Sequence, residues 1–192
     1  METRELILQT AIEQFNALGT ARVTTNLIAK EAGISPGNLY YHFSDKAHII
    51  REIYEHMIRA WESAYEEVEG EFMPNDALEN FVKVNFELLW RYRFFYRETV
   101  ALMNADPLLR QRHIDVTQAR FQRQRLFLQR QAQQGVLRFT DPEKEMDDVL
   151  TIAWIVANHY LIHLESLGKT VDKRDFETGA ALVMKVLQPY LA

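Results

Sequence analysis

Apolar residues recur along this chain at the period of an α-helix almost from end to end. Near the start of the sequence, Ile7, Ala11, Phe15 and Leu18 fall three or four positions apart, which places them on one helical face. Gly19 follows them as a stop signal. Only seven glycines and five prolines interrupt the 192 residues. This pattern predicts an all-α protein of about nine helices.

The next strong pattern predicts two short helices on either side of one glycine, Gly33. Thr24 or Thr25 can cap the first helix, because a side-chain hydroxyl accepts a backbone N–H that a helix start leaves unpaired. Ser35 can cap the second helix in the same way, and Pro36 then occupies a first helical position that needs no N–H. The spacing is typical of a helix-turn-helix, whose second helix can enter the major groove of DNA.

The second of these helices carries an unusual set of side chains. Leu39 and Phe43 are four residues apart and fall on one face, so they are expected to hold the helix against its neighbours. The residues left pointing largely elsewhere are Asn38, Tyr40, Tyr41 and His42. Such groups hydrogen-bond to phosphates and base edges, which favours DNA contact. The alternative interpretation is an aromatic turn of the core.

A resemblance to the TetR family of bacterial transcriptional regulators is carried by residues 28–46, which read IAKEAGISPGNLYYHFSDK. The resemblance implies a DNA-binding domain over residues 1–47, built as a three-helix unit with a helix-turn-helix. It also implies a helical ligand-binding and dimerisation domain over residues 48–192. A homodimer would bind a pseudo-palindromic operator and leave it when a small-molecule effector binds, with the helix expected from residue 45 to 70 as the lever.

The family's DNA contacts carry over to matching positions of this sequence. The residues implied are Thr25, Asn26, Ser35, Pro36, Gly37, Asn38, Tyr40, Tyr41, His42 and Lys46. Among these, Thr25 and Lys46 would hold phosphates. Asn26 departs from the family, in which an arginine that reaches a base often stands at this position.

The family also implies an effector pocket between the helices of the second domain. Its candidate lining is Trp61, Asn85, Phe86, Trp90, Tyr96, Met103, Thr117, Phe121, Trp154 and Asn158. This makeup suits an apolar or amphipathic effector, although an ordinary helical core has the same makeup.

The last two predicted helices hold more apolar surface than one small domain can bury. Such a pair usually packs against its own copy across a two-fold axis, which predicts a homodimer. The candidate interface residues are Ile152, Ile155, Val156, His159, Ile162, Phe176, Ala180, Val183, Met184 and Leu187.

A long helix predicted from residue 107 to 134 is rich in arginine. A basic helix can be a nucleic-acid surface, but a solvated face is the interpretation favoured here. The residues then expected to turn inward are Ile114, Thr117, Phe121, Leu126 and Leu128.

Composition excludes several other classes of protein. The absence of cysteine removes disulfides and thiolate metal sites, and no leader or apolar run of about 18–20 residues is present, so a cytoplasmic protein is expected. The net charge of −5 argues against a general polyanion binder. His159 and His163 have metal-ligand spacing but lack a third ligand, so neither a metal nor a cofactor is predicted.

No serine stands in a nucleophile elbow and no glycine-rich phosphate loop is present, so the sequence does not predict an enzyme. A DNA-binding transcriptional repressor released by an effector is the favoured function. An activator or ligand-insensitive regulator of the same fold is one alternative. A helical small-molecule-binding protein with a non-functional DNA motif is another.

Overall fold

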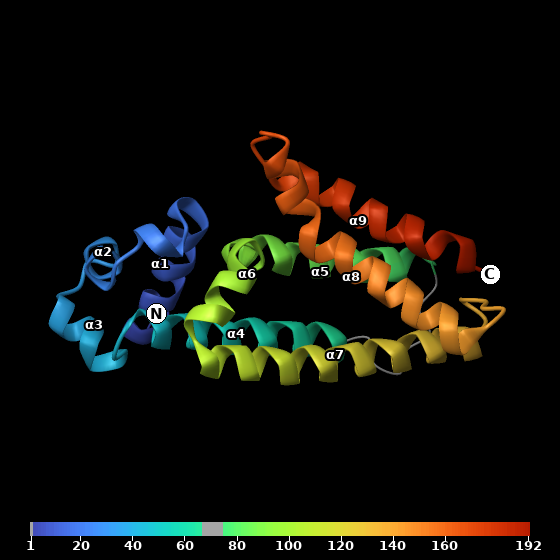
Figure 1. Ribbon diagram of the computed structural model, residues 1–192, viewed down its shortest axis with the longest axis horizontal. Coiled ribbons are helices and arrows are strands. Elements are labelled where there is room, and N and C mark those ends of the chain that lie inside the picture. The colour runs from blue at the N-terminus through green and yellow to red at the C-terminus, as the bar shows by residue number, and fades with distance from the viewer. Residues whose placement is uncertain (1, 67–74) are drawn as a thin grey trace. The chain divides into compact units, whose positions relative to one another are not determined.

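The computed structural model describes residues 2–66 and 75–192, except for the side chains of residues 75–77 and 176. Within these ranges the chain is helical, without a β-strand, and the predicted all-α fold is confirmed (Figure 1). The helices are α1 (Thr3–Leu18), α2 (Thr25–Glu31), α3 (Pro36–His42), α4 (Lys46–Glu66), α5 (Asn75–Arg91), α6 (Arg93–Ala105), α7 (Pro107–Gln133), α8 (Pro142–Ser166) and α9 (Lys173–Leu187). Two short 3₁₀ turns, η1 (Thr20–Arg22) and η2 (Gln188–Tyr190), complete them.

The chain divides into two compact units. Unit 1 holds residues 1–60 and 91–110, and unit 2 holds residues 61–90 and 111–192. The boundary predicted between residues 47 and 48 falls inside unit 1, and it stays a prediction about functional domains. The end of the expected lever helix, beyond residue 66, lies outside the described residues.

Unit 1 is built around α1, which packs against both α2 and α6. Ile7, Ala11 and Phe15 are fully buried on α1, and the ring of Phe15 lies 5.2 Å from that of Phe94 on α6. Leu18 was expected on the same stripe but is 43% exposed. The buried stripe of α1 therefore ends at Phe15.

The part of α4 in unit 1 is apolar on two faces and buries both. Ile49 and Ile53 on one face are at most 1% exposed, and Ile50 and Tyr54 on the other are at most 6% exposed. Tyr54 stacks on Phe95 of α6 with ring centroids 4.9 Å apart. A helix buried on two faces links the elements that pack on each of them.

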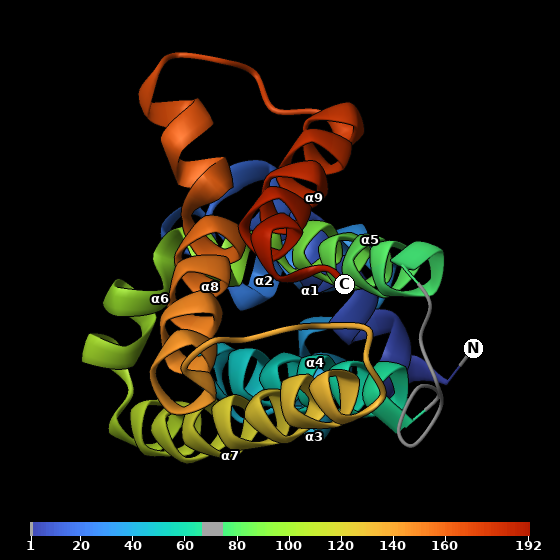
Figure 2. The same ribbon diagram turned by 90° about the vertical axis from the view of Figure 1, so that its right-hand side faces the viewer.

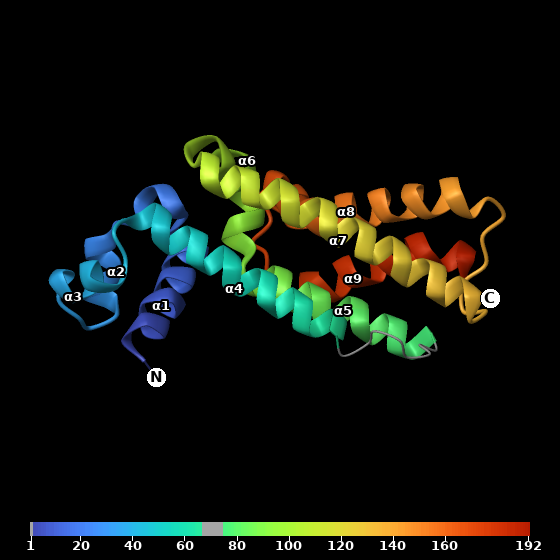
Figure 3. The same ribbon diagram turned by 90° about the horizontal axis from the view of Figure 1, so that it is seen from below.

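Unit 2 contains the rest of the apolar core. Figure 2 shows α8 and α9 next to each other, and these two helices are in direct contact. Figure 3 shows α5 beside the end of α4, where the rings of Tyr65 and Phe81 meet edge to face at 5.0 Å. One cluster of buried residues joins several helices and the 134–141 connection: Leu78, Leu128, Leu137, Met146, Val149, Leu150 and Leu187.

The inward face predicted for α7 is partly wrong. Leu128 is buried, and Thr117 and Phe121 are half-buried, but Ile114 is 38% and Leu126 is 54% exposed. The arginine face is not simply solvated either, because Arg120 packs on two tryptophans. The weak apolar period of this helix did not identify which side meets α4 and α8.

No helix in the described ranges is both long enough and apolar enough to cross a bilayer.

Candidate nucleic-acid interface

The short helix α3 separates its buried side chains from its exposed ones along the helical period. Leu39 and the next apolar residue on that face, Phe43, are completely buried. Tyr41 is 84% exposed and Tyr40 is 50% exposed. The alternative of an aromatic turn packed into the core is therefore wrong, since both tyrosines reach solvent.

Side-chain caps hold α2 and α3 in place as the sequence predicts. Thr24 Oγ1 accepts a hydrogen bond from the backbone N–H of Leu27 at 3.2 Å, so Thr24 rather than Thr25 is the cap of α2. Ser35 Oγ accepts one from the N–H of Asn38, also at 3.2 Å. Gly33 adopts a φ of 67°, which a side chain would strain, and it turns the chain from α2 into α3.

The remaining candidate DNA contacts gather around the exposed side of these two helices. Asn26, Ser35, Pro36, Gly37 and Asn38 are exposed. Thr25, His42 and Lys46 are half-buried.

A hydrogen bond of 2.9 Å joins Thr25 Oγ1 to the hydroxyl of Tyr40 and so connects α2 to α3. The ring of His42 meets that of Tyr41 edge-on at 5.1 Å. A hydroxyl of α2 and the imidazole of His42 thus lie next to the exposed tyrosines of α3. These groups can hydrogen-bond to phosphate oxygens and base edges.

Lys46 has a structural role in addition to any role on DNA. Its Nζ donates hydrogen bonds to the carbonyl oxygens of Thr20 at 2.7 Å and Val23 at 3.0 Å. These bonds hold the η1 connection to the start of α4. An ammonium group has three N–H donors, so one remains for a phosphate.

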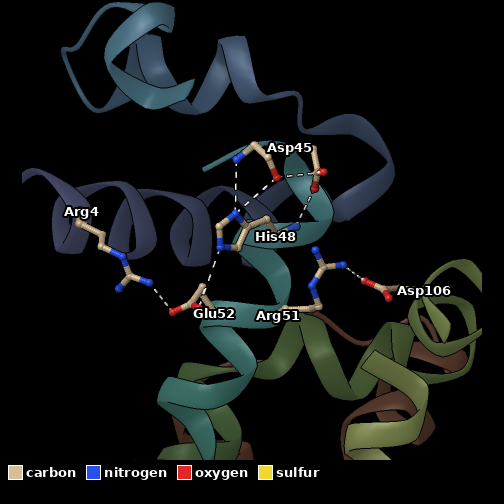
Figure 4. Close-up of polar contacts among 7 residues, drawn as sticks. Arg4, Asp45, His48, Arg51, Glu52 and Asp106 are labelled. Atoms are coloured by element: carbon tan, nitrogen blue, oxygen red, sulfur yellow. Dashed lines mark hydrogen bonds and ion pairs between the residues drawn. The ribbon is translucent and has the colours of Figure 1, made fainter. Parts of the chain in front are cut away.

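A polar network fixes the turn from α3 into α4 (Figure 4). Asp45 Oδ1 accepts the backbone N–H of His48 at 2.7 Å, and the ring of His48 accepts the N–H of Ser44 at 3.3 Å. The first of these bonds is the main reason that the pKa of Asp45 is lowered. On the next turn, Glu52 pairs with Arg4 of α1. The start of α4 is thereby joined to both α1 and the end of α3.

Contacts also join α6 to the end of α1 and to η1. Asn16 at the end of α1 accepts the backbone N–H of Phe94 at 3.0 Å. Glu98 accepts the N–H of Thr20 at 3.0 Å and is also hydrogen-bonded to its hydroxyl. Arg51 of α4 pairs with Asp106 at the start of α7, as Figure 4 shows. The sequence analysis did not predict these contacts, because they join residues far apart in the chain.

The candidate effector residues do not all belong to one unit. Tyr96 and Met103 lie in unit 1. The candidates in unit 2 are Trp61, Asn85, Phe86, Trp90, Thr117, Phe121, Trp154 and Asn158. Trp61 and Phe86 are each 3% exposed, and the other members of this second group are half-buried.

A cluster in unit 2 brings two of the candidate tryptophans together. We call Trp61, Tyr65, Arg120, Gln124 and Trp154 the arginine–aromatic cluster. The guanidinium carbon of Arg120 lies 4.3 Å from the ring centroid of Trp61 and 5.5 Å from that of Trp154. Gln124 accepts a hydrogen bond from the indole N–H of Trp154, and burial raises the pKa of Tyr65 to about 12.

Sequence reasoning missed Arg120, Tyr65 and Gln124 in this cluster. Arg120 and Gln124 lie four residues apart, which puts them on one side of α7. Because α7 contains many other arginines and glutamines, the spacing of this pair did not stand out in the sequence.

The candidate dimer residues divide by their exposure. Ile152 and Ile155 on α8 are 48% and 57% exposed, and His159 is exposed as well. Val156, Ile162 and Met184 are half-buried, whereas Ala180, Val183 and Leu187 are buried within the chain. The side chain of Phe176 lies outside the described residues.

Comparison with known proteins agrees with the helix-turn-helix and the helical fold around it. A family model described as "Bacterial transcriptional repressor" matches residues 51–192, and one described as "Bacterial regulatory proteins, tetR family" matches residues 7–53. The chain belongs to the TetR family. The resemblance carried by residues 28–46 is confirmed.

Two solved structures of similar proteins cover nearly the whole chain. A TetR-family transcriptional regulator from Marinobacter aquaeolei VT8 is 30% identical, with a TM-score of 0.89 over 100% of this chain and 92% of its own. A transcriptional regulator from Saccharomonospora viridis, solved in complex with choline, has a TM-score of 0.76 over 95% of each chain. At 19% identity, this second likeness shows the fold alone.

The curated relatives match a shorter stretch of this TetR-family chain. The HTH-type transcriptional regulator AcrR of Shigella flexneri is 41% identical over 54 residues, which are 28% of this chain. The match spans 25% of the length of AcrR. The family and fold are those of transcriptional regulators.

Proposed function

We propose that this TetR-family protein is a DNA-binding transcriptional repressor that acts in the cytoplasm and leaves its operator when a small molecule binds unit 2. The observation that carries the proposal is the surface of α3. Tyr41 is 84% exposed on a seven-residue helix whose Leu39 is completely buried. A helix of this length with a polar, aromatic outer face fits a major groove.

The proposed contacts divide into two kinds. Thr25 and Lys46 bind phosphates, and they do so with hydrogen bonds more than with a strong positive field, given the net charge of −5. Asn26, Ser35 and the residues 36–42 other than Leu39 form the surface toward the bases.

Two copies are needed to bind a pseudo-palindromic operator with both recognition helices. The exposed residues Ile152, Ile155 and His159 of α8 are proposed as the centre of the dimer contact, with the half-buried Ile162 and Met184 beside them. Exposed isoleucines on one helix face lose contact with water when a second copy covers them. Ile155→Arg is expected to give a monomer by sedimentation velocity and to weaken operator binding.

Operator binding is tested by fluorescence anisotropy with the DNA upstream of the protein's own gene and a random duplex of equal length. The repressor is expected to prefer its own upstream DNA at moderate salt. Tyr41→Ala and His42→Ala should each weaken specific binding by about tenfold or more without changing the unfolding midpoint, since each residue loses about 1–3 kcal/mol of base or backbone contact.

Leu108→Ala serves as the control, because Leu108 is 69% exposed in unit 1 and lies away from α3 in the sequence. The proposal is wrong if the dimer shows no preference between the two duplexes, or if Tyr41→Ala binds as tightly as the unmodified protein. A promoter assay with the effector present and absent then separates repression from activation.

A further inference from the structure

The guanidinium of Arg120 lies in unit 2 and has no carboxylate partner among the residues that the structure describes. It lies over the indoles of Trp61 from α4 and Trp154 from α8. Its charge also acts on Tyr65 and His113, and no carboxylate among the described residues pairs with it. A positive charge held this way is stabilised by the ring faces but keeps its N–H donors available.

Two buried donors in the arginine–aromatic cluster lack an acceptor. Arg120 Nε and Trp61 Nε1 are both removed from solvent, and neither has a hydrogen-bond partner among the described residues. Trp154, by contrast, donates its indole N–H to Gln124. Buried hydrogen-bond donors are almost always paired in folded proteins. Here two unpaired donors belong to side chains that contact each other, and this pairing calls for an explanation. A ligand that supplies acceptor oxygens gives one.

The charges and rings around these donors favour an anion with an apolar body. Arg123 lies over the ring of Tyr65 at 5.6 Å, so a second cation stands near the first. A tyrosine phenol is neutral at physiological pH, and burial raises the pKa of Tyr65 further, to about 12, so Tyr65 adds no negative charge beside Arg120. Phe121 adds an apolar ring, 6.1 Å from that of Trp154.

A cationic ligand fits this cluster poorly. The bound choline of the Saccharomonospora viridis structure belongs to a relative of low identity. In the present protein, Arg120 already occupies the indole faces that a quaternary ammonium would need. A cation would have to displace the guanidinium and would leave both donors unpaired.

We propose that the effector is an aromatic or aliphatic carboxylate whose oxygens accept hydrogen bonds from Arg120 Nε and Trp61 Nε1. The proposal rests on the proposed function, since it names the chemical class of the small molecule that acts on unit 2. Both donor atoms are covered by protein, so the carboxylate reaches them when the Arg120 side chain turns. The apolar part of the ligand then packs on the ring of Phe121, beside Trp154.

The test uses three probes with one skeleton and different charges: 4-phenylbutyrate, 4-phenylbutyramide and 4-phenylbutylammonium. Binding to the purified full-length protein is measured by isothermal titration calorimetry, without DNA. The carboxylate is expected to bind at least about tenfold more tightly than the amide and the ammonium, because hydrogen bonds to charged groups are about twice as strong as neutral ones. Equal or tighter binding of the amide or the ammonium, or no binding of the carboxylate, overturns the proposal.

Substitutions in the cluster test which side chains cause the preference for the carboxylate over the amide. Arg120→Met should remove the tenfold difference between carboxylate and amide, whereas Arg110→Met should keep it, since Arg110 is exposed on the same helix. Trp61→Phe keeps an aromatic ring but lacks the donor, and it should weaken carboxylate binding severalfold, by more than it weakens amide binding. If Arg120→Met fails to fold, the Trp61→Phe variant and the three-probe comparison still decide the question. An unchanged tenfold preference in folded Arg120→Met overturns it.

A parallel measurement separates this inference from the proposed function. Operator binding is followed by anisotropy with and without 4-phenylbutyrate. Specific DNA binding without any preference for the carboxylate refutes the proposal of an anionic effector but not the proposal that the protein is a repressor. Carboxylate binding that depends on Arg120, in a protein that shows no DNA preference, supports the ligand site and refutes the repressor.

Discussion

Gly179 allows α9 to approach its neighbours more closely than any other residue type would. It is buried in α9, and a Cβ atom added there would lie 2.5 Å from Cε1 of Phe86 on α5. The same atom would lie 2.8 Å from Cδ1 of Tyr160 on α8. Ordinary carbon contacts are about 3.5–4.0 Å, so both rings would have to move by about 1 Å. Gly179→Ala therefore tests how rigidly these three helices are packed.

Two opposing effects decide the sign of this substitution. Alanine is better than glycine in a helix interior by about 1 kcal/mol, which would stabilise the variant. Overpacking a well-filled core costs about 1–3 kcal/mol, and two displaced aromatic rings place this site in the upper half of that range. The expected net change is a loss of about 1–2 kcal/mol in the free energy of unfolding.

Urea and thermal unfolding at one fixed protein concentration measure this loss, because the stability of a dimer depends on concentration. The unfolding temperature should fall by about 2–8 °C for a chain of this size. Gly37→Ala is the matched control, since a Cβ at Gly37 meets only Ser35 Oγ, at 4.0 Å. The control should be as stable as the unmodified protein or slightly more so. An unchanged or raised midpoint for Gly179→Ala would refute the packing argument.

Three further predictions concern unit 1. Leu39→Ala should lower the free energy of unfolding by about 2–5 kcal/mol in urea titrations, because Leu39 is completely buried. Burial alone would raise the pKa of Asp106, but hydrogen bonds from the Leu109 N–H and from Arg51 outweigh it and leave the pKa below its ordinary value of 3.8. Asp106→Asn should therefore be less stable at neutral pH, and the difference should shrink as the pH falls below 3.8, where the native carboxylate takes up its proton. Burial lowers the pKa of His56 below 6.5, so its contribution to stability is complete above pH 6.5 and is lost as the pH falls below that value. In His56→Gln the urea midpoint should change less between about pH 7 and pH 5 than in the unmodified protein. A fall of the midpoint with pH that is as steep in the variant would contradict this assignment.

The helix-turn-helix could be predicted from the sequence because its signals are local. A capping hydroxyl lies three residues before the N–H that it accepts, and two apolar residues four positions apart face the same way. Both relations follow from helix geometry alone. Ser35, Leu39 and Tyr41 accordingly lie where the sequence placed them. The one ambiguity, Thr24 or Thr25, concerned a shift of a single residue, and the cap hydrogen bond falls on Thr24.

The inward side of α7 could not be predicted in the same way. Its arginines and glutamines interrupt the apolar period, so the sequence indicates a helix but not the face that meets other helices. Ile114 and Leu126 turned out to be exposed, whereas Arg120 turns toward Trp61. The position of Arg120 depends on indoles supplied by α4 and α8, and no pattern within α7 contains that information.

The case of Lys46 shows a related limit. The resemblance implies that it binds phosphate, and this role stays a prediction. Its ammonium also binds the carbonyl oxygens of Thr20 and Val23. Such a bond depends on the path of the η1 connection, which the residue types alone do not specify.

The shortness of α3 explains how stability and recognition are divided among its residues. An isolated helix of fewer than about 12 residues is marginal in water, so seven-residue α3 depends on contacts outside itself. Those contacts are the buried Leu39, the Ser35 cap and the turn fixed by Asp45. None of them uses the exposed ring of Tyr41. Substitutions at Tyr41 should therefore change DNA affinity alone, whereas those at Leu39 should change affinity and folding together.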